Sequence, residues 1–318
     1  KWHLGDQPEF LPTRQGFDSY FGIPFSNDMG QKDRPTKQYP PLPLLRMEKV
    51  IEEEPDQRLI TQRYTREAIA FIERNKARPF FLYLPLSSPH TPIVPSKPWQ
   101  GKSDIGKYGD FLMETDWVVG QVLQALDRHR LAKDTIVIFA TDNGCSPAAK
   151  IPALVAKGHK PNADWRGHKA DIFEGGHRVP FLVRWPGKVA AGSTSGQTIC
   201  TADLFATVAD VLGKSETIPA NAAEDSFSFL PALLGQAQAN APSPFPLFGV
   251  GGVGVGQPLG QPLLCLGQFR VVGEVAPLVR VGLVVVQFLA AVGIPDVTPA
   301  RGAQPVVVSP VRGEGGSL

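Results

Sequence analysis

The hydrophobic positions of the chain form short, dense runs separated by longer periodic stretches. Three runs rich in β-branched and aromatic residues lie at 79–84, 135–140 and 179–183, each bounded by proline, glycine or aspartate. Runs of this length and composition are typical of buried strands. The proline-rich and acidic stretch 31–55 has neither pattern, and we expect it to form a long surface excursion.

The stretches between the runs keep a helical period. Apolar residues recur every three to four positions from Ile60 to Ile72 and again from Ile105 to Leu126, which predicts two amphipathic helices. A third helix is predicted from an N-cap at Thr201 to a stop at Gly213. Strands that alternate with helices predict an α/β fold, with a mostly parallel sheet covered by helices on both faces.

The composition changes sharply near residue 235. No lysine follows Lys214, and valine, glycine, proline and leucine dominate from about Pro242 onward. We therefore predict a folded domain over 1–235 and an aberrant or poorly ordered tail over 236–318, with a linker and a small β subdomain as the alternative. The apolar run 281–295 is shorter than the about 20 residues of a membrane span, so no span is expected.

Charge and cysteine content narrow the function classes. The 318 residues are 42% hydrophobic and 19% charged, which is ordinary for a globular protein. A net charge of +2 does not indicate a nucleic-acid surface, so no nucleic-acid partner is expected. Cys145, Cys200 and Cys265 form no C-x-x-C pair, which argues against a disulfide framework and a thiolate zinc site.

Polar residues follow two of the predicted strands, at the edge where α/β sheets bind ligands. Asp142 and Asn143 come directly after the second run; their oxygens suit a hard cation such as Ca²⁺ or, less well, Mg²⁺. A simple turn is the alternative for this Asp-Asn-Gly sequence. His90, in a proline-flanked loop after the first run, is either structural or able to bind an anion or protonate a leaving group.

Three further sets of residues have different interpretations. Lys1 and His3, one residue apart on an extended segment, are expected to point the same way and could hold an anion together, the alternative being a solvated terminal lysine. Cys145 has no local base to activate it, so we reject it as a nucleophile. The nine-residue spacing of the histidines at 159, 168 and 177 fits no metal-ligand pattern.

Taken together, the motifs resemble those of the sulfatases, closest to the arylsulfatase A type. The matching segments follow one another over about residues 1–235: Lys1-Trp2-His3-Leu4-Gly5, Gln15-Gly16-Phe17-Asp18, Gly22-Ile23-Pro24-Phe25-Ser26-Asn27-Asp28, Arg78-Pro79-Phe80-Phe81-Leu82-Tyr83, Ser88-Pro89-His90-Thr91-Pro92, Thr141-Asp142-Asn143-Gly144, and Lys169 through Glu174 to Pro180. The resemblance implies an alkaline-phosphatase-like α/β fold and hydrolysis of a sulfate ester at a calcium ion.

The resemblance also assigns roles to individual residues. It implies Asp142 and Asn143 as metal ligands, Lys1, His90 and Lys169 as sulfate-binding or leaving-group residues, His3 as support for the nucleophile, and Ser26 as a site-lining hydroxyl.

The chain departs from the family pattern in two respects. The family carries a cysteine in a C-x-P-x-R context that becomes formylglycine, and an N-terminal pair of aspartates that completes the metal site. Neither is present, and Cys145-Ser146-Pro147 lacks the arginine. We therefore expect a fold incomplete at the N-terminus and a chain that is inactive by itself.

Two other functions stay open from the sequence. One is a phosphodiesterase or phosphonate hydrolase of the same superfamily, although Asn143 in place of a histidine favours the sulfatase. The other is a non-catalytic module that binds sulfated glycans. The expected substrate is an aryl sulfate or a sulfated sugar, and the resemblance implies a periplasmic, secreted or lysosome-like compartment.

Overall fold

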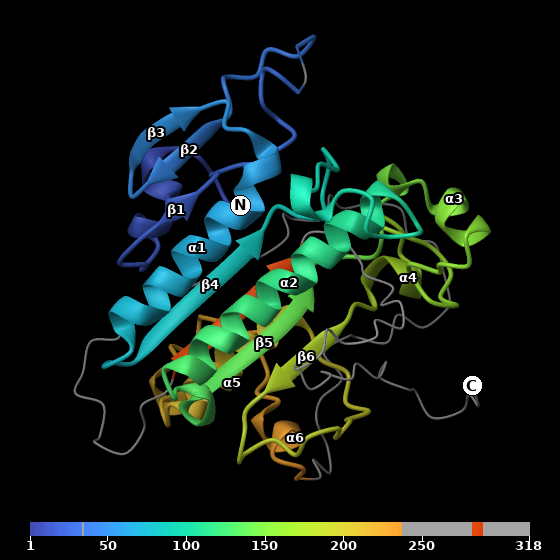
Figure 1. Cartoon of the computed structure of the whole chain (residues 1–318). Helices are drawn as coiled ribbons and strands as arrows, with labels where there is room; N and C mark the ends of the chain where they lie inside the picture. Colours follow the sequence, from blue (N-terminus) through green and yellow to red (C-terminus); the bar gives the residue numbers. More distant parts are fainter. Residues whose placement is uncertain (34, 237–281, 289–318) are drawn as a thin grey trace, which may run out of the picture. The chain divides into compact units, whose positions relative to one another are not determined.

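The computed structural model describes residues 1–33, 35–236 and 282–288 (Figure 1). These residues divide into two compact units, one formed by 1–186 with 282–288 and the other by 187–236. The division falls at Pro186 rather than near residue 235, where the composition changes. All residues of the predicted site belong to the first unit.

A mixed sheet in the order β4-β7-β5-β6 forms the centre of the first unit. Strands β4 (Phe80–Leu86) and β5 (Thr135–Thr141) confirm two of the predicted runs, each shifted or extended by up to two residues at its ends. Both strands pair in parallel with β7 (Gly282–Phe288), so that Gly282 lies opposite Phe80 on one side and Thr135 on the other.

Strand β7 comes from the segment 236–318, the part of the chain with the biased composition. Val284 and Val285 are buried, and Val284 belongs to the hydrophobic core. A run of β-branched residues between two strand edges can satisfy its backbone hydrogen bonds on both sides, which explains why this part of the biased segment is ordered. The remainder of the predicted tail lies outside the described residues.

The third predicted run forms β6 (Phe181–Arg184), which pairs antiparallel with β5 and makes the sheet mixed. The reason is the connection between the two strands. It contains a 3-10 turn and the short helices α3 (Ile151–Ala156) and α4 (Glu174–His177), whereas a parallel crossover needs an element long enough to return along the sheet. After β5 the chain therefore returns from the edge where β5 ends, and β6 runs in the opposite direction.

Helices α1 (Gln57–Asn75) and α2 (Lys107–Arg128) confirm the two predicted amphipathic helices and pack against β4 and β5 (Figure 1). Asp56 caps α1 by accepting a hydrogen bond from the Arg58 amide at 3.0 Å. The core between these helices and the sheet is formed by fully buried residues such as Ile60, Ile72, Val118, Val122 and Leu126. Helix cover of the second sheet face stays a prediction.

The expected surface excursion at 31–55 is partly wrong, because this segment contains a β-hairpin. Strands β2 (Pro43–Arg46) and β3 (Lys49–Glu53) pair antiparallel, and β1 (Phe21–Gly22) pairs with β2 on the other side. Leu42 and Leu44 are fully buried and join the core, whereas every residue of β3 is exposed. The alternation that identifies a half-buried strand is therefore missing from β3.

The second unit contains α5 (Leu204–Val211) and α6 (Leu230–Leu233). The predicted N-cap at Thr201 is wrong: Thr201 begins a 3-10 turn, and Cys200 and Asp203 form the reciprocal cap. The predicted stop holds, since Gly213 adopts a φ of +62° directly after the helix. The 3-10 turns are Pro8–Phe10, Pro12–Arg14, Lys97–Trp99, Ala132–Asp134, Pro147–Ala149, Thr201–Asp203 and Ser215–Thr217.

Among the described helices, none is both long and apolar enough to cross a membrane.

Candidate active site

The first residues of the chain lie beside the carboxyl end of β4. The α-amino group of Lys1 contacts the Pro85 carbonyl in β4, and the Trp2 amide donates to the Ile23 carbonyl at 2.8 Å. This docking brings the Lys1 ammonium to the Ser26 hydroxyl, with Nζ 3.0 Å from Oγ. Ser26 in turn donates to the Asp28 carboxylate at 2.6 Å, so a buried lysine is connected to an acid through a hydroxyl.

The Lys1 ammonium is buried in a group of charges that come from distant parts of the sequence. Only 4% of the residue is exposed. Burial lowers its pKa to about 8; Asp28 and Asp142 oppose this change, and the Lys169 ammonium adds to it. Lys1 therefore interacts electrostatically with residues that follow β5 and with the loop that carries Lys169.

Asp142 and Asn143 follow β5 directly, as the sequence predicts. Desolvation by the surrounding protein raises the pKa of Asp142 to about 6, while Lys169 and Lys1 lower it. The residue nevertheless remains exposed to solvent, so water screens the carboxylate and the direction of the shift carries more weight than its size. The side-chain amide of Asn143 donates from Nδ2 to the Gly144 carbonyl at 2.9 Å. The side-chain nitrogen of Asn143 therefore points toward the backbone.

Backbone hydrogen bonds fix the loop that carries Lys169 against the end of β5. The Lys169 amide donates to the Cys145 carbonyl at 3.0 Å, and the Gly144 amide donates to the Gly176 carbonyl at 2.9 Å. A Cβ on Gly144 would lie 1.7 Å from the Gly175 carbonyl oxygen. Glycine at this position therefore permits the close approach that brings Lys169 next to Asp142.

His90 completes the cluster from the loop after β4. Its Nδ1 lies 2.9 Å from the Thr91 carbonyl; a carbonyl only accepts, so Nδ1 carries the proton and Nε2 keeps a lone pair. Burial and the Lys1 ammonium lower the pKa of His90, the Thr91 carbonyl raises it, and Lys169 lowers it. On balance these effects lower the pKa of His90 and so favour the neutral imidazole.

The extended conformation expected for Lys1 to His3 is wrong at His3, whose φ is +62°. The left-handed residue turns the chain so that its amide donates to the Pro24 carbonyl at 2.8 Å. Partial desolvation lowers the pKa of His3, and Lys1 and His90 lower it further. The residue is exposed, so water screens these effects, but the interactions place it at the border of the same cluster.

The structure adds residues that sequence reasoning did not select. Asp28 interacts with Lys1, His3 and His90. Burial raises the pKa of Tyr83 in β4, and the negative charge of Asp142 raises it further. The polar run that follows Phe25 is the sequence signal for Asp28, whereas Tyr83 lies within a strand pattern that predicts only packing.

The rejected cysteine and the spaced histidines lie in other environments. Cys145 is fully buried, its thiol lies 3.5 Å from the Tyr108 hydroxyl, and burial raises its pKa. His168 and His177 each lie near an acid of their own loop, Asp171 and Glu174. Over the described part of the chain, no three His, Cys, Asp or Glu residues are grouped as metal ligands.

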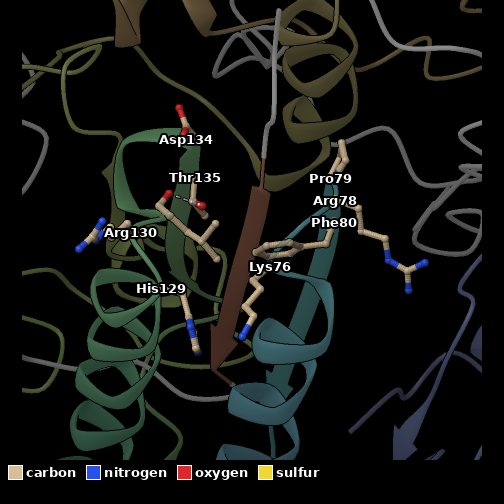
Figure 2. A pocket seen from close by; sticks show the side chains of 9 residues that line it. Lys76, Arg78, Pro79, Phe80, His129, Arg130, Asp134 and Thr135 are labelled. Carbon is tan, nitrogen blue, oxygen red and sulfur yellow. Dashed lines mark hydrogen bonds between the residues drawn. The ribbon is translucent and has the colours of Figure 1, made fainter. Parts of the chain in front are cut away.

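A separate cavity of about 240 Å³ lies at the amino ends of β4 and β5 and includes Lys76, Phe80 and His129. Figure 2 shows that the Arg78 and Arg130 side chains at this cavity point away from each other. Such divergence does not form an anion site, and the cavity contains none of the predicted site residues.

Comparison with known proteins identifies the family of the chain. The family profile described as Sulfatase matches residues 1–214. The chain is 37% identical to the N-acetylgalactosamine-6-sulfatase of Canis lupus familiaris over 76% of its own length and 47% of that protein. It is 34% identical to arylsulfatase G of Rattus norvegicus, over 75% of its own length and 50% of that protein.

Solved structures show the same fold. The crystal structure of Ps i-CgsB in complex with k-i-k-neocarrahexaose superposes with a TM-score of 0.61 at 27% identity, covering 74% of this chain and 53% of that one. The PsFucS1 sulfatase from Pseudoalteromonas sp. superposes with a TM-score of 0.62 at 23% identity, covering 73% of this chain and 50% of that one. The chain belongs to the sulfatase family and has its α/β fold. It spans about half the length of the relatives it matches.

Proposed function

We propose that the chain forms the sulfate-binding part of a site that hydrolyses sulfate esters of sugars. The observation that supports this proposal is the electrostatic interaction of Lys1 and Lys169 with both Asp142 and His90, read from their effects on the pKa of these two residues. Two ammonium groups beside a neutral imidazole form a local positive field, which suits a sulfuryl group that gains negative charge in the transition state. The name of the relatives, N-acetylgalactosamine-6-sulfatase, supports a sulfated sugar as substrate.

The chain's own residues would divide the work as follows. Lys1 and Lys169 would bind the sulfuryl oxygens, with Ser26 fixing the Lys1 ammonium through its hydrogen bond at 3.0 Å. His90 would donate to the departing alcohol oxygen from Nε2. The negative charge of a bound sulfate would raise the pKa of His90, so that Nε2 would take up a proton from water and could then pass it to the alcohol oxygen. His3 would support the nucleophile from the border of the cluster.

Asp142 and Asn143 fit a hard divalent cation by the nature of their donors. A carboxylate with a raised pKa gains from a nearby positive charge, and both side chains offer the oxygen ligands that calcium prefers. Calcium takes about six to eight oxygen ligands, so this pair would supply part of a larger set. When bound, the cation would offset negative charge on the sulfuryl oxygens.

We further propose that this chain is inactive without additional sequence. Cys145 does not suit the nucleophile, because its thiol is buried and its pKa is raised rather than lowered. None of the three cysteines stands in the C-x-P-x-R context from which the family resemblance implies a formylglycine.

Binding to the chain itself tests the proposed function without requiring turnover. The probe is N-acetylgalactosamine 6-sulfate in the presence of Ca²⁺, measured by titration calorimetry. Lys169→Ala should weaken binding roughly tenfold, because it removes a charge-assisted contact. Lys160→Ala is the matched control; Lys160 forms an exposed ion pair with Asp164, and its removal should leave binding unchanged.

Two results would contradict the proposal. Equal effects of the two lysine substitutions would show that only overall charge matters. Tighter binding of the corresponding 6-phosphate, again dependent on Lys169, would favour a phosphoesterase of the same superfamily.

A further inference from the structure

Exposed apolar side chains gather on the loop that carries Lys169. Within the segment 165–173, which we call the arch, Trp165 is 39% exposed, Ile172 87% and Phe173 38%. Single exposed apolar residues are common on protein surfaces, but a concentration of them on one short segment is characteristic of a binding surface.

The arch is held in place by its own hydrogen bonds. The Gly175 amide donates to the Arg166 carbonyl at 2.8 Å and closes its base. The Asn162 side chain donates to the Gly167 carbonyl at 3.0 Å. Ala170 adopts a φ of +76° at the centre of the arch, a conformation that costs an alanine energy and persists only where the surroundings enforce it. These contacts hold the backbone on both sides of Ile172.

Two guanidinium groups cover the aromatic rings of the arch. Arg166 lies over Phe173 at 3.7 Å from the ring centroid, and Arg178 lies over Trp165 at 4.3 Å. Arg178 also contacts Glu174. Within the described residues, Arg166 forms no ion pair with an acid. The surface therefore combines apolar area with positive charge.

The arch is also close to the candidate site. Lys169 belongs to it, and the three Cα-to-Cα steps from Lys169 to Ile172 span at most about 11 Å. Lys169 is fixed at the end of β5 by its hydrogen bond to Cys145 at 3.0 Å. A molecule that places its sulfate at Lys169 and extends by a few ring lengths can therefore reach Trp165 or Ile172.

We propose that the arch binds the sugar units that adjoin the sulfated one in an anionic oligosaccharide. The C–H face of a sugar ring is apolar and packs against Trp165 and Ile172, while a carboxylate or a second sulfate on the same unit binds Arg166. The arch thus selects extended anionic glycans over isolated sulfated sugars. This inference rests on the proposed function, because it assumes that Lys169 binds the sulfate ester.

The test compares two ligands on the full chain by titration calorimetry. One is N-acetylgalactosamine 6-sulfate, and the other is a tetrasaccharide that contains this sugar alternating with a uronic acid. The wild-type chain should bind the tetrasaccharide more tightly. Trp165→Ala should weaken tetrasaccharide binding roughly tenfold and Ile172→Ser roughly threefold, and neither should change monosaccharide binding more than about twofold.

Control variants separate a lost contact from a lost fold. Val50→Ser, at a residue on β3 that is 46% exposed, should leave both affinities unchanged. Ile172 is the most exposed residue of the arch, so Ile172→Ser tests the idea even if Trp165→Ala misfolds. Arg166→Gln should weaken only the charged tetrasaccharide and reduce the salt dependence of its binding.

The possible outcomes distinguish this inference from the proposed function. Equal losses for both ligands, no loss for either, or equal binding of an uncharged tetrasaccharide would overturn the inference. If Lys169→Ala weakens monosaccharide binding but the arch variants leave tetrasaccharide binding intact, the proposed function stands and the arch inference fails. If Lys169→Ala changes neither ligand while Trp165→Ala weakens the tetrasaccharide, the proposed function fails, and so does the inferred extension from the sulfate site.

Discussion

Replacing Gly144 by alanine adds only one methyl group, but it should destabilise the fold strongly. The new Cβ would lie 1.7 Å from the Gly175 carbonyl oxygen and 2.8 Å from its carbon. Both are backbone atoms, so no side-chain rotation can relieve the overlap. The segment at 175–176 must move, which breaks the hydrogen bond from the Gly144 amide to the Gly176 carbonyl. Overpacking costs about 1–3 kcal/mol and the lost bond about 1 kcal/mol, so we expect a loss of about 2–4 kcal/mol.

Urea denaturation followed by tryptophan fluorescence measures this loss, with an unchanged m-value as the sign that only stability changed. Gly120→Ala is the matched control. Gly120 lies within α2, and a Cβ there would meet no atom within 4 Å. This control should stabilise the chain by about 0.5–1 kcal/mol, since alanine restricts the unfolded helix segment. A Gly144→Ala variant within about 0.5 kcal/mol of the original protein would refute the close approach on which the position of Lys169 depends.

The remaining predictions concern chemistry. The isolated chain should hydrolyse neither p-nitrophenyl sulfate nor p-nitrophenyl phosphate above background, with or without Ca²⁺; turnover that Cys145→Ala abolishes would contradict our rejection of that thiol. In any form of the protein that hydrolyses a sulfate ester, Lys169→Ala should lower kcat/KM by roughly 100-fold or more, as expected for a charge at the reacting group, and an unchanged kcat/KM would exclude that role. The Lys1 ammonium should titrate with a pKa of about 8 in an NMR experiment, and Lys169→Ala should raise this pKa because it removes a like charge. Because the folded-state pKa lies below the ordinary 10.5, the stability contribution of Lys1 is full above pH 10.5 and is lost as the pH falls through about 8; a pKa near 10.5 would contradict its burial.

The sequence predicts those elements whose pattern is local. Helices α1 and α2 keep a 3.6-residue period because one face of each is buried, and β5 is apolar almost throughout because it lies inside the sheet. The hairpin of β2 and β3 escaped detection because β3 is exposed along its whole length and carries no alternation. Its partner β2 contributes Leu44, which is fully buried, but four residues are too few to reveal a period.

Some residues of the candidate site could likewise be predicted from the sequence, and others could not. Asp142 could be found from the sequence because it follows a recognisable strand. Its proximity to Lys1 and Lys169 could be anticipated only from the family resemblance, since backbone contacts made by glycines and carbonyls bring them together. Asp28 was not found, because a single acid in a polar turn resembles many surface residues. The arch was not found either, because Trp165 and Ile172 stand in no pattern that separates an exposed residue from a buried one.

The place of β7 in the sheet has a consequence for the order in which the protein folds. Strand β4 ends at Leu86 and β5 at Thr141, yet each pairs with a strand that begins at Gly282. Such pairings close long loops, and contacts of high sequence separation form slowly. Until residues 282–288 arrive, the facing edges of β4 and β5 carry unpaired amides and carbonyls that can recruit a strand from another chain. During synthesis, α1, α2 and the β2–β3 hairpin can form early, whereas the central sheet waits for this late segment. Chaperone demand and aggregation should therefore be greatest in the interval between the emergence of β5 and that of β7.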